Sequence, residues 1–97
     1  MHVGFGAFEL HLPYVRDLKA KRRIVKSLVD RLHARHRVSV AETGHHDLLQ
    51  RAQIGVAVVA STSFDVERIL VTIEELVAQE TEAVVLDWQP EILGEET

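Results

Sequence analysis

The sequence contains no cysteine, which excludes disulfide bonds, thiolate zinc sites and a cysteine nucleophile. It has no run that approaches the ~20 apolar residues of a membrane-spanning helix. Residues 1–12 also lack the basic region, apolar core and small-residue cleavage site of a secretory signal. Since chains without cysteine fit a reducing compartment, we expect a cytoplasmic protein that is neither secreted nor inserted in a membrane.

Proline, glycine and aromatic residues are scarce: the chain has two prolines, five glycines, three phenylalanines, one tyrosine and one tryptophan. No repeat or low-complexity stretch occurs, and a composition with 46% hydrophobic and 27% charged residues is typical of globular proteins. Disordered, fibrous and collagen-like proteins are therefore disfavoured. A length of 97 residues suits one domain with one core.

Charge is unevenly distributed along the chain, although the net charge is only −4. Nine of the eleven Lys and Arg residues lie between Arg16 and Arg37, where two acids leave a local charge of +7. From Asp65 onward ten acids face the single base Arg68, which gives −9. This separation predicts a positive surface on a protein whose overall charge is negative.

Hydrophobic periodicity predicts four strands and two helices. Alternating or continuous apolar runs indicate strands over residues 2–12, 37–43, 51–60 and 83–88. Apolar residues spaced three and four apart predict a helix that Asp17 caps and that ends near Arg35. A second helix is expected after the capping residues 61–63, with a buried face made of Val66, Ile69, Leu70, Ile73, Leu76 and Val77.

The βαββαβ order predicts an α+β, ferredoxin-like sandwich, with four antiparallel strands in the spatial order 4-1-3-2 and two helices on one face. We place this single domain at residues 1–93 and a short acidic tail at 94–97, and we expect the chain from residue 91 onward to be loose. In this topology the end of the first strand, the start of the first helix and the connection between the second and third strands meet at one edge.

Five motifs occur in order along the chain: His2-Val3-Gly4, Glu9-Leu10-His11-Leu12-Pro13, Leu18-Lys19-x-Lys21-Arg22-Arg23, Val38-Ser39-Val40-Ala41-Glu42 and His45-x-Asp47-Leu48-x-Gln50-Arg51-Ala52. With these motifs the chain resembles the YlxP-like family of small bacterial proteins, ferredoxin-like domains of unknown function. The genes of that family often lie beside those of translation-initiation and ribosome-maturation factors, so the resemblance implies a role with RNA or the ribosome. His46 and Leu49 stand where the family usually has Gln and Trp, which disfavours a mechanism that needs paired histidines or a stacking indole there.

A basic edge is the main candidate for binding. Cationic side chains around the start of a helix are suited to anions, phosphate above all, and the topology brings a basic residue of the third strand to the same edge. The alternative is an ordinary solvated charged face. The basic edge consists of Arg16, Lys19, Lys21, Arg22, Arg23, Lys26 and Arg51.

A second candidate is a metal or small-ligand site in the connection between the second and third strands. Imidazole and carboxylate groups together bind divalent metals, and a histidine can move protons. Adjacent histidines are not a standard ligand spacing, however, and an aspartate before Leu48 also caps turns. The residues of this candidate site are His11, His45, His46 and Asp47, with Glu42 nearby.

A third candidate is the face of the sheet that no helix covers. Alternation predicts that Phe8, Leu10, Leu12, Ile54, Val56, Leu86 and Trp88 point toward the helices. The open face then carries an apolar patch that a homodimer would cover. The predicted dimer face consists of Val3, Phe5, Ala7, Ala57, Val59 and Val85, while Gly4 and Gly6 suit either the close approach of a helix or partner, or a bulge.

Three functions remain open. The first is a non-enzymatic module that binds RNA or the ribosome through phosphate contacts. We expect no base stacking on the sheet, because residues 51–58 include no aromatic residue. The second is a metal-binding or small-ligand protein, or an enzyme, that uses the His/Asp cluster. The third is a dimeric adaptor that binds another protein. No cofactor and no catalytic residue are predicted.

Overall fold

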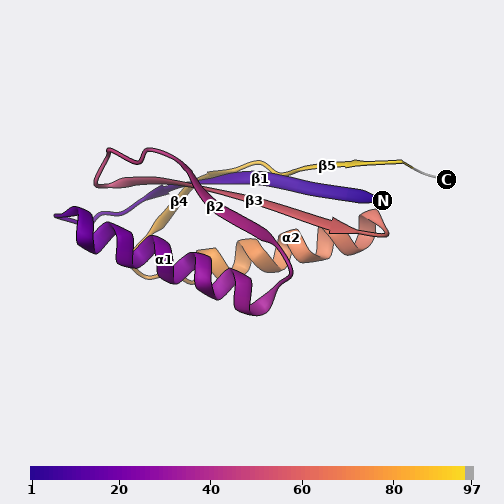
Figure 1. Cartoon of the computed structure of the whole chain (residues 1–97), viewed down its shortest axis with the longest axis horizontal. Helices are drawn as coiled ribbons and strands as arrows, with labels where there is room; N and C mark the ends of the chain where they lie inside the picture. The colour runs from indigo at the N-terminus through magenta and orange to yellow at the C-terminus, as the bar shows by residue number, and fades with distance from the viewer. Residues whose placement is uncertain (96–97) are drawn as a thin grey trace.

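The computed structural model describes residues 1–95 and has the predicted ferredoxin-like fold. The sheet order β2-β3-β1-β4 is the predicted one read from the other edge, and both helices lie on the same side of the sheet (Figure 1). The elements are β1 (His2–His11), α1 (Leu18–Arg35), β2 (Ser39–Gly44), β3 (Arg51–Ala60), α2 (Ser63–Ala78), β4 (Val84–Trp88) and β5 (Glu91–Gly94).

Both helices begin where the sequence predicts a cap. The Asp17 carboxylate accepts a hydrogen bond from the Ala20 amide at 2.7 Å, and the Thr62 hydroxyl accepts one from the Asp65 amide at 3.1 Å. Each bond satisfies an amide that the first helical turn leaves without a partner. The cap at Asp17 fixes where α1 starts, and so where the cationic side chains of its first turns lie.

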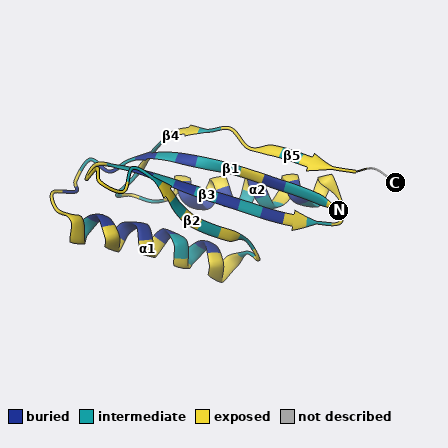
Figure 2. Ribbon diagram, turned by 45° about the horizontal axis from the view of Figure 1, so that its top comes forward, coloured by how far each residue is buried: buried dark blue, intermediate teal, exposed yellow. Residues whose placement is uncertain are grey.

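The core forms between the helices and one face of β1 and β3. Phe8, Leu10 and Ile54 are buried on this face, where Trp88 stacks on Phe8 with ring centroids 3.8 Å apart. Gly4 lies where α2 comes close to the sheet, because a Cβ atom there would sit 2.5 Å from Cγ1 of Val66. The buried residues follow β1 and β3 along most of their length (Figure 2).

β4 lies where the sequence predicts a strand, but the predicted orientations of Val85 and Leu86 were wrong, because a β-bulge changes the alternation. β1 and β4 pair Glu9 with Asp87 but Leu10 with Val85, so one extra residue, Leu86, stands in β4. The bulge turns Val85 toward the helices, where it packs on the core, and leaves Leu86 52% exposed. Val85 therefore does not belong to the predicted dimer face.

Residues 91–94 are not loose, contrary to our prediction, but form strand β5. β5 pairs antiparallel with the first half of β1, from His2 opposite Gly94 to Phe5 opposite Glu91. Its Ile92 side chain packs against the small core cluster around Val58. Gly94, the first residue of the predicted tail, thus belongs to a strand, and residues 96 and 97 of that tail lie outside the described part of the chain.

The end of β1, the beginning of α1 and the beginning of β3 meet at one end of the molecule, as the topology requires. The Leu12 amide donates to the Gln50 carbonyl at 3.0 Å, and the Gln50 side chain donates to the Val15 carbonyl at 3.1 Å. The connection from β1 to α1 forms the left tip in Figure 1, beside the connection from β2 to β3. Within residues 1–95, no helix is long and apolar enough to cross a membrane.

Candidate functional site

Three exposed basic residues gather where α1 begins, and we call them the cationic end: Arg16, Lys19 and Arg22. None of them forms an ion pair within residues 1–95. The first turn of α1 holds no acid, and the Asp17 carboxylate before it is engaged as the N-cap. Within the described residues, the three side chains therefore have no acidic partner at ion-pair distance.

Arg23 and Lys26 are also exposed, but each contacts an acid. Arg23 lies 3.2 Å from Glu82, whose carboxylate raises the pKa of the guanidinium above its ordinary value, first by hydrogen bonding and then by its charge. Lys26 pairs with Asp30 one turn along α1 at 2.7 Å. Surface pairs of this kind contribute little to stability, so neither basic side chain is held strongly by its acidic partner.

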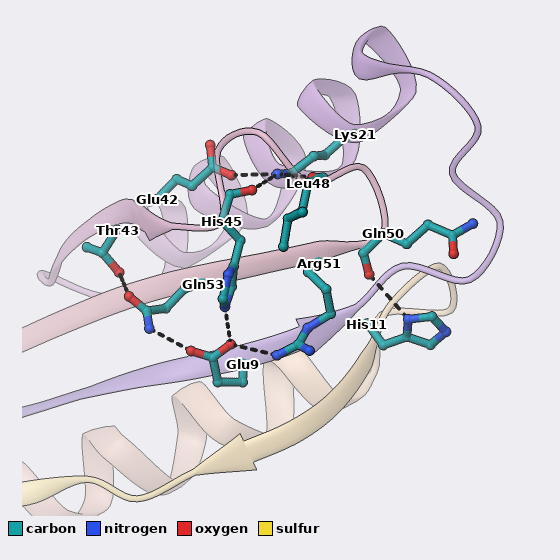
Figure 3. A network of polar contacts seen from close by, with 10 residues as sticks. All are labelled: Glu9, His11, Lys21, Glu42, Thr43, His45, Leu48, Gln50, Arg51 and Gln53. Atoms are coloured by element: carbon teal, nitrogen blue, oxygen red, sulfur yellow. Dashed lines mark hydrogen bonds and ion pairs between the residues drawn. The ribbon is translucent and has the colours of Figure 1, made fainter.

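Lys21 is not part of an anion site, which corrects the prediction for this residue. Its side chain is 2% exposed, and Nζ donates to the carbonyls of His45 and Leu48 at 2.6 Å each. Glu42 Oε2 lies 3.4 Å from the same nitrogen. The ammonium group thus fastens the β2–β3 connection to α1 and has no room for a phosphate (Figure 3).

Arg51 belongs to a polar network on the open face of the sheet, centred on Glu9. One Glu9 oxygen accepts from Arg51 at 3.1 Å and lies 2.8 Å from His45 Nε2, while the other accepts from Gln53 at 2.6 Å (Figure 3). The hydrogen bond from Gln53 is the largest cause that lowers the Glu9 pKa below its ordinary value; burial, the second largest, opposes it, and His45 and Arg51 add smaller lowering effects. Arg51 therefore already has an anionic partner.

The structure separates the four residues of the predicted metal site. His45 faces Glu9, His46 lies 3.9 Å from Glu42, and His11 Nδ1 lies 3.2 Å from the Gln50 carbonyl. No group of three or more His, Asp or Glu side chains in residues 1–95 is arranged to hold a metal ion. His45 instead occupies the left-handed backbone region with φ 61°, at the turn where β2 ends.

A groove beside α1 lies next to the cationic end. It has a volume of about 430 Å³, and Arg22 and Lys26 line it together with the apolar Leu18, Val25 and Val29. Glu42 and His46 line it from the side of β2. The groove therefore presents basic and apolar groups together, on the flank of α1 that faces away from α2.

The open face of the sheet has an apolar half and a polar half. Phe5, Val59 and Leu93 are exposed in the apolar half, near a shallow depression of about 620 Å³ lined by small residues such as Ala7 and Ala57. The polar half holds the Glu9 network. Glu9 and Gln53 are direct cross-strand partners. The alternation that placed Phe5 and Ala57 on the open face also places Glu9 and Gln53 there, so the sequence could have predicted that these two side chains meet.

These features define a small ferredoxin-like α+β domain with a cationic end and a polar network on its open face. A family model described as "Protein of unknown function (DUF503)" matches residues 3–90, and the chain belongs to this family. It is 32% identical over 66 residues to the Bacillus subtilis (strain 168) protein "Uncharacterized protein YlxP", covering 68% of this chain and 72% of that protein. The resemblance to the YlxP-like family is thereby confirmed.

Two solved structures align with this chain. A C-terminal segment of the alpha subunit of aIF2 from Pyrococcus abyssi aligns with a TM-score of 0.50 and 19% identity, over 97% of this chain and 50% of that one. This chain thus spans half the length of that structure. A de novo designed protein with ferredoxin fold aligns with a TM-score of 0.49 and 17% identity, over 98% of this chain and 87% of that one.

Proposed function

We propose that the protein is a non-enzymatic module that binds RNA, with ribosomal RNA as the first candidate, in the cytoplasm. The observation that carries the proposal is the cationic end, where three exposed basic side chains have no acidic partner within residues 1–95. Phosphate contacts with Lys and Arg supply most of the affinity of non-specific nucleic-acid binding. Arg23 and Lys26 extend this surface along α1 once phosphates replace Glu82 and Asp30.

The overall shape supports the proposal despite the negative net charge. The molecule measures 50 × 21 × 17 Å, and the acidic strand β5 lies at the end opposite the cationic end (Figure 1). Interactions over more than a Debye length, about 8 Å at physiological salt, are largely screened. Glu91 of β5 and Glu95 after it therefore do little to weaken the positive potential where α1 begins.

The experiment compares two triple variants that lose the same charge. Arg16→Gln with Lys19→Gln and Arg22→Gln removes the cationic end, whereas Arg35→Gln with Arg37→Gln and Arg68→Gln removes basic residues elsewhere. In filter binding of untagged protein to ribosomal RNA at low salt, we expect the first variant to lose at least about tenfold in affinity and the second to change much less. Equal affinities of the two variants would refute the proposed site.

A second candidate function is a homodimer, which also suits a protein-interaction adaptor. The apolar half of the open face supports it, because Val59 and Leu93 are exposed there on β3 and β5, the two strands that flank the first half of β1. Contiguous apolar patches on monomers are often interaction sites. Sedimentation equilibrium tests this directly: we expect a dimer that Val59→Asp dissociates, and a monomer at high concentration would exclude it.

A further inference from the structure

Tyr14, the only tyrosine of the chain, is 73% exposed at the end of the molecule where α1 begins. It occupies the third position of a β-turn, in which the Val15 amide donates to the Leu12 carbonyl at 3.2 Å. Pro13 holds the second position, where its fixed φ angle favours such a turn. The sequence gives no reason for an aromatic ring at this position, since it does not contribute to the core.

The turn around Tyr14 is held firmly on both sides. Leu12 and Val15 are buried, and Gln50 bonds to the backbone of each: its carbonyl accepts from the Leu12 amide, and its side chain donates to the Val15 carbonyl. The ring is therefore presented to solvent on a fixed backbone. With the backbone fixed, only the two side-chain torsions of the tyrosine remain to be ordered, so the ring loses little conformational entropy when a flat group packs on it.

The cationic end follows Tyr14 directly in the chain. Arg16 lies two residues further on, and Lys19 and Arg22 are on the first turns of α1. Exposed aromatic rings beside cationic side chains are the arrangement with which proteins bind single-stranded nucleic acids, since bases stack on the rings while Lys and Arg neutralise the phosphates. In a duplex the bases are already stacked and paired, so the ring has no exposed base to contact.

We propose that the cationic end takes single-stranded RNA, with one unstacked base on the Tyr14 ring and the neighbouring phosphates on Arg16 and Lys19. This inference rests on the proposed RNA-binding function and narrows its substrate to loops, bulges and strand ends. Because every base has a flat face, the contact favours single strands without selecting a sequence.

Other exposed aromatic rings lack the basic surroundings. Phe64 is 69% exposed on α2, and the chain beside it carries Asp65 and Glu67. Phe5 lies on the open sheet face opposite Ala57 on one side and Glu91 on the other. Tyr14 is therefore the exposed ring within residues 1–95 that stands beside basic residues without an acidic partner.

The test measures the affinities of a single-stranded RNA oligonucleotide and of a duplex of the same sequence. Tyr14→Ala should weaken binding of the single strand about 5- to 150-fold, the range that loss of one base-stacking contact gives, and leave duplex binding unchanged. Tyr14→Phe keeps the flat ring and should bind the single strand nearly as the wild type does. Phe64→Ala, which removes an equally exposed ring from α2, should change neither affinity.

The outcomes separate this inference from the proposed function. If the wild type binds both RNAs and Tyr14→Ala binds the single strand equally well, the stacking site is refuted while RNA binding by the cationic end stands. If Tyr14→Ala loses only its association with ribosomal particles and keeps that with the oligonucleotide, the ring contacts a protein and the inference is overturned. If the wild type binds neither RNA, both proposals fail.

Discussion

Lys21 shows how one side chain can leave a predicted surface and take a structural role. A lysine next to the apolar stripe of a helix is usually expected to extend its ammonium group into water. Here the carbonyls of His45 and Leu48, more than twenty residues away, come within 2.6 Å of Nζ. The periodicity of α1 carries no information about that connection, so the sequence could place Lys21 beside the core but could not show its partners.

Replacing Lys21 by methionine should destabilise the protein by about 3 kcal/mol. Methionine keeps the apolar stem, but both carbonyls lose their charged donor and Glu42 loses its counter-ion. Lys19→Met, an exposed change on the same helix, should stay within about 0.5 kcal/mol. Urea unfolding of the two variants measures the difference, and equal stabilities would show that the buried ammonium group does not hold the connection.

Glu9 should make the stability of the protein depend on pH in the acid range. Its pKa is lowered in the folded state, so the folded protein favours the ionised carboxylate. This stabilisation is fully present above the ordinary pKa of 4.5 and is lost as the pH falls through the lowered value.

The variant Glu9→Gln removes this contribution. We expect it to be less stable than the wild type by about 1–3 kcal/mol at pH 7, because His45, Arg51 and Gln53 lose a charged acceptor. The difference in the free energy of unfolding between the wild type and Glu9→Gln should become smaller at pH 3. Glu91→Gln, the same change at an exposed position, serves as control, and a gap that stays constant between the two pH values would contradict the account.

At the level of the elements, long segments were predictable and short or irregular ones were not. β3 and α1 carry clear patterns over 10 and 18 residues, and their observed bounds agree with the prediction. β4 has five residues, and one bulge reverses its alternation between Val85 and Trp88. β5 has four residues in an acidic segment, which is too short for a periodic signal.

Strand β5 can be tested by a pair of adjacent substitutions. Ile92 packs on the cluster around Val58, whereas Leu93 is exposed on the open face. Ile92→Ser should therefore lower the free energy of unfolding by about 1–2 kcal/mol, while Leu93→Ser should leave it nearly unchanged. Thermal unfolding of the two variants measures this difference. If residues 91–94 were loose, neither substitution would change the stability.

At the level of the whole molecule, the opposite charges of the two halves meet on only one side of α1. Arg23 pairs with Glu82 and Arg31 with Glu80, both in the connection that follows α2. At the start of α1, Arg16, Lys19 and Arg22 have no acidic partner within residues 1–95. The sequence predicted a positive surface from the local charge of +7, but only the folded arrangement shows which of its residues lack an acidic partner.

The most direct test of RNA binding by the cationic end is the salt dependence of the affinity. For single-stranded RNA, log Kobs falls against log salt concentration by about 0.7 for each phosphate neutralised. Three contacts contribute about −2 to this slope, so the slope of the wild type should be steeper by about 2 than that of the variant with glutamine at residues 16, 19 and 22. The same slope in both proteins, or no binding by the wild type at the lowest salt, would contradict the account.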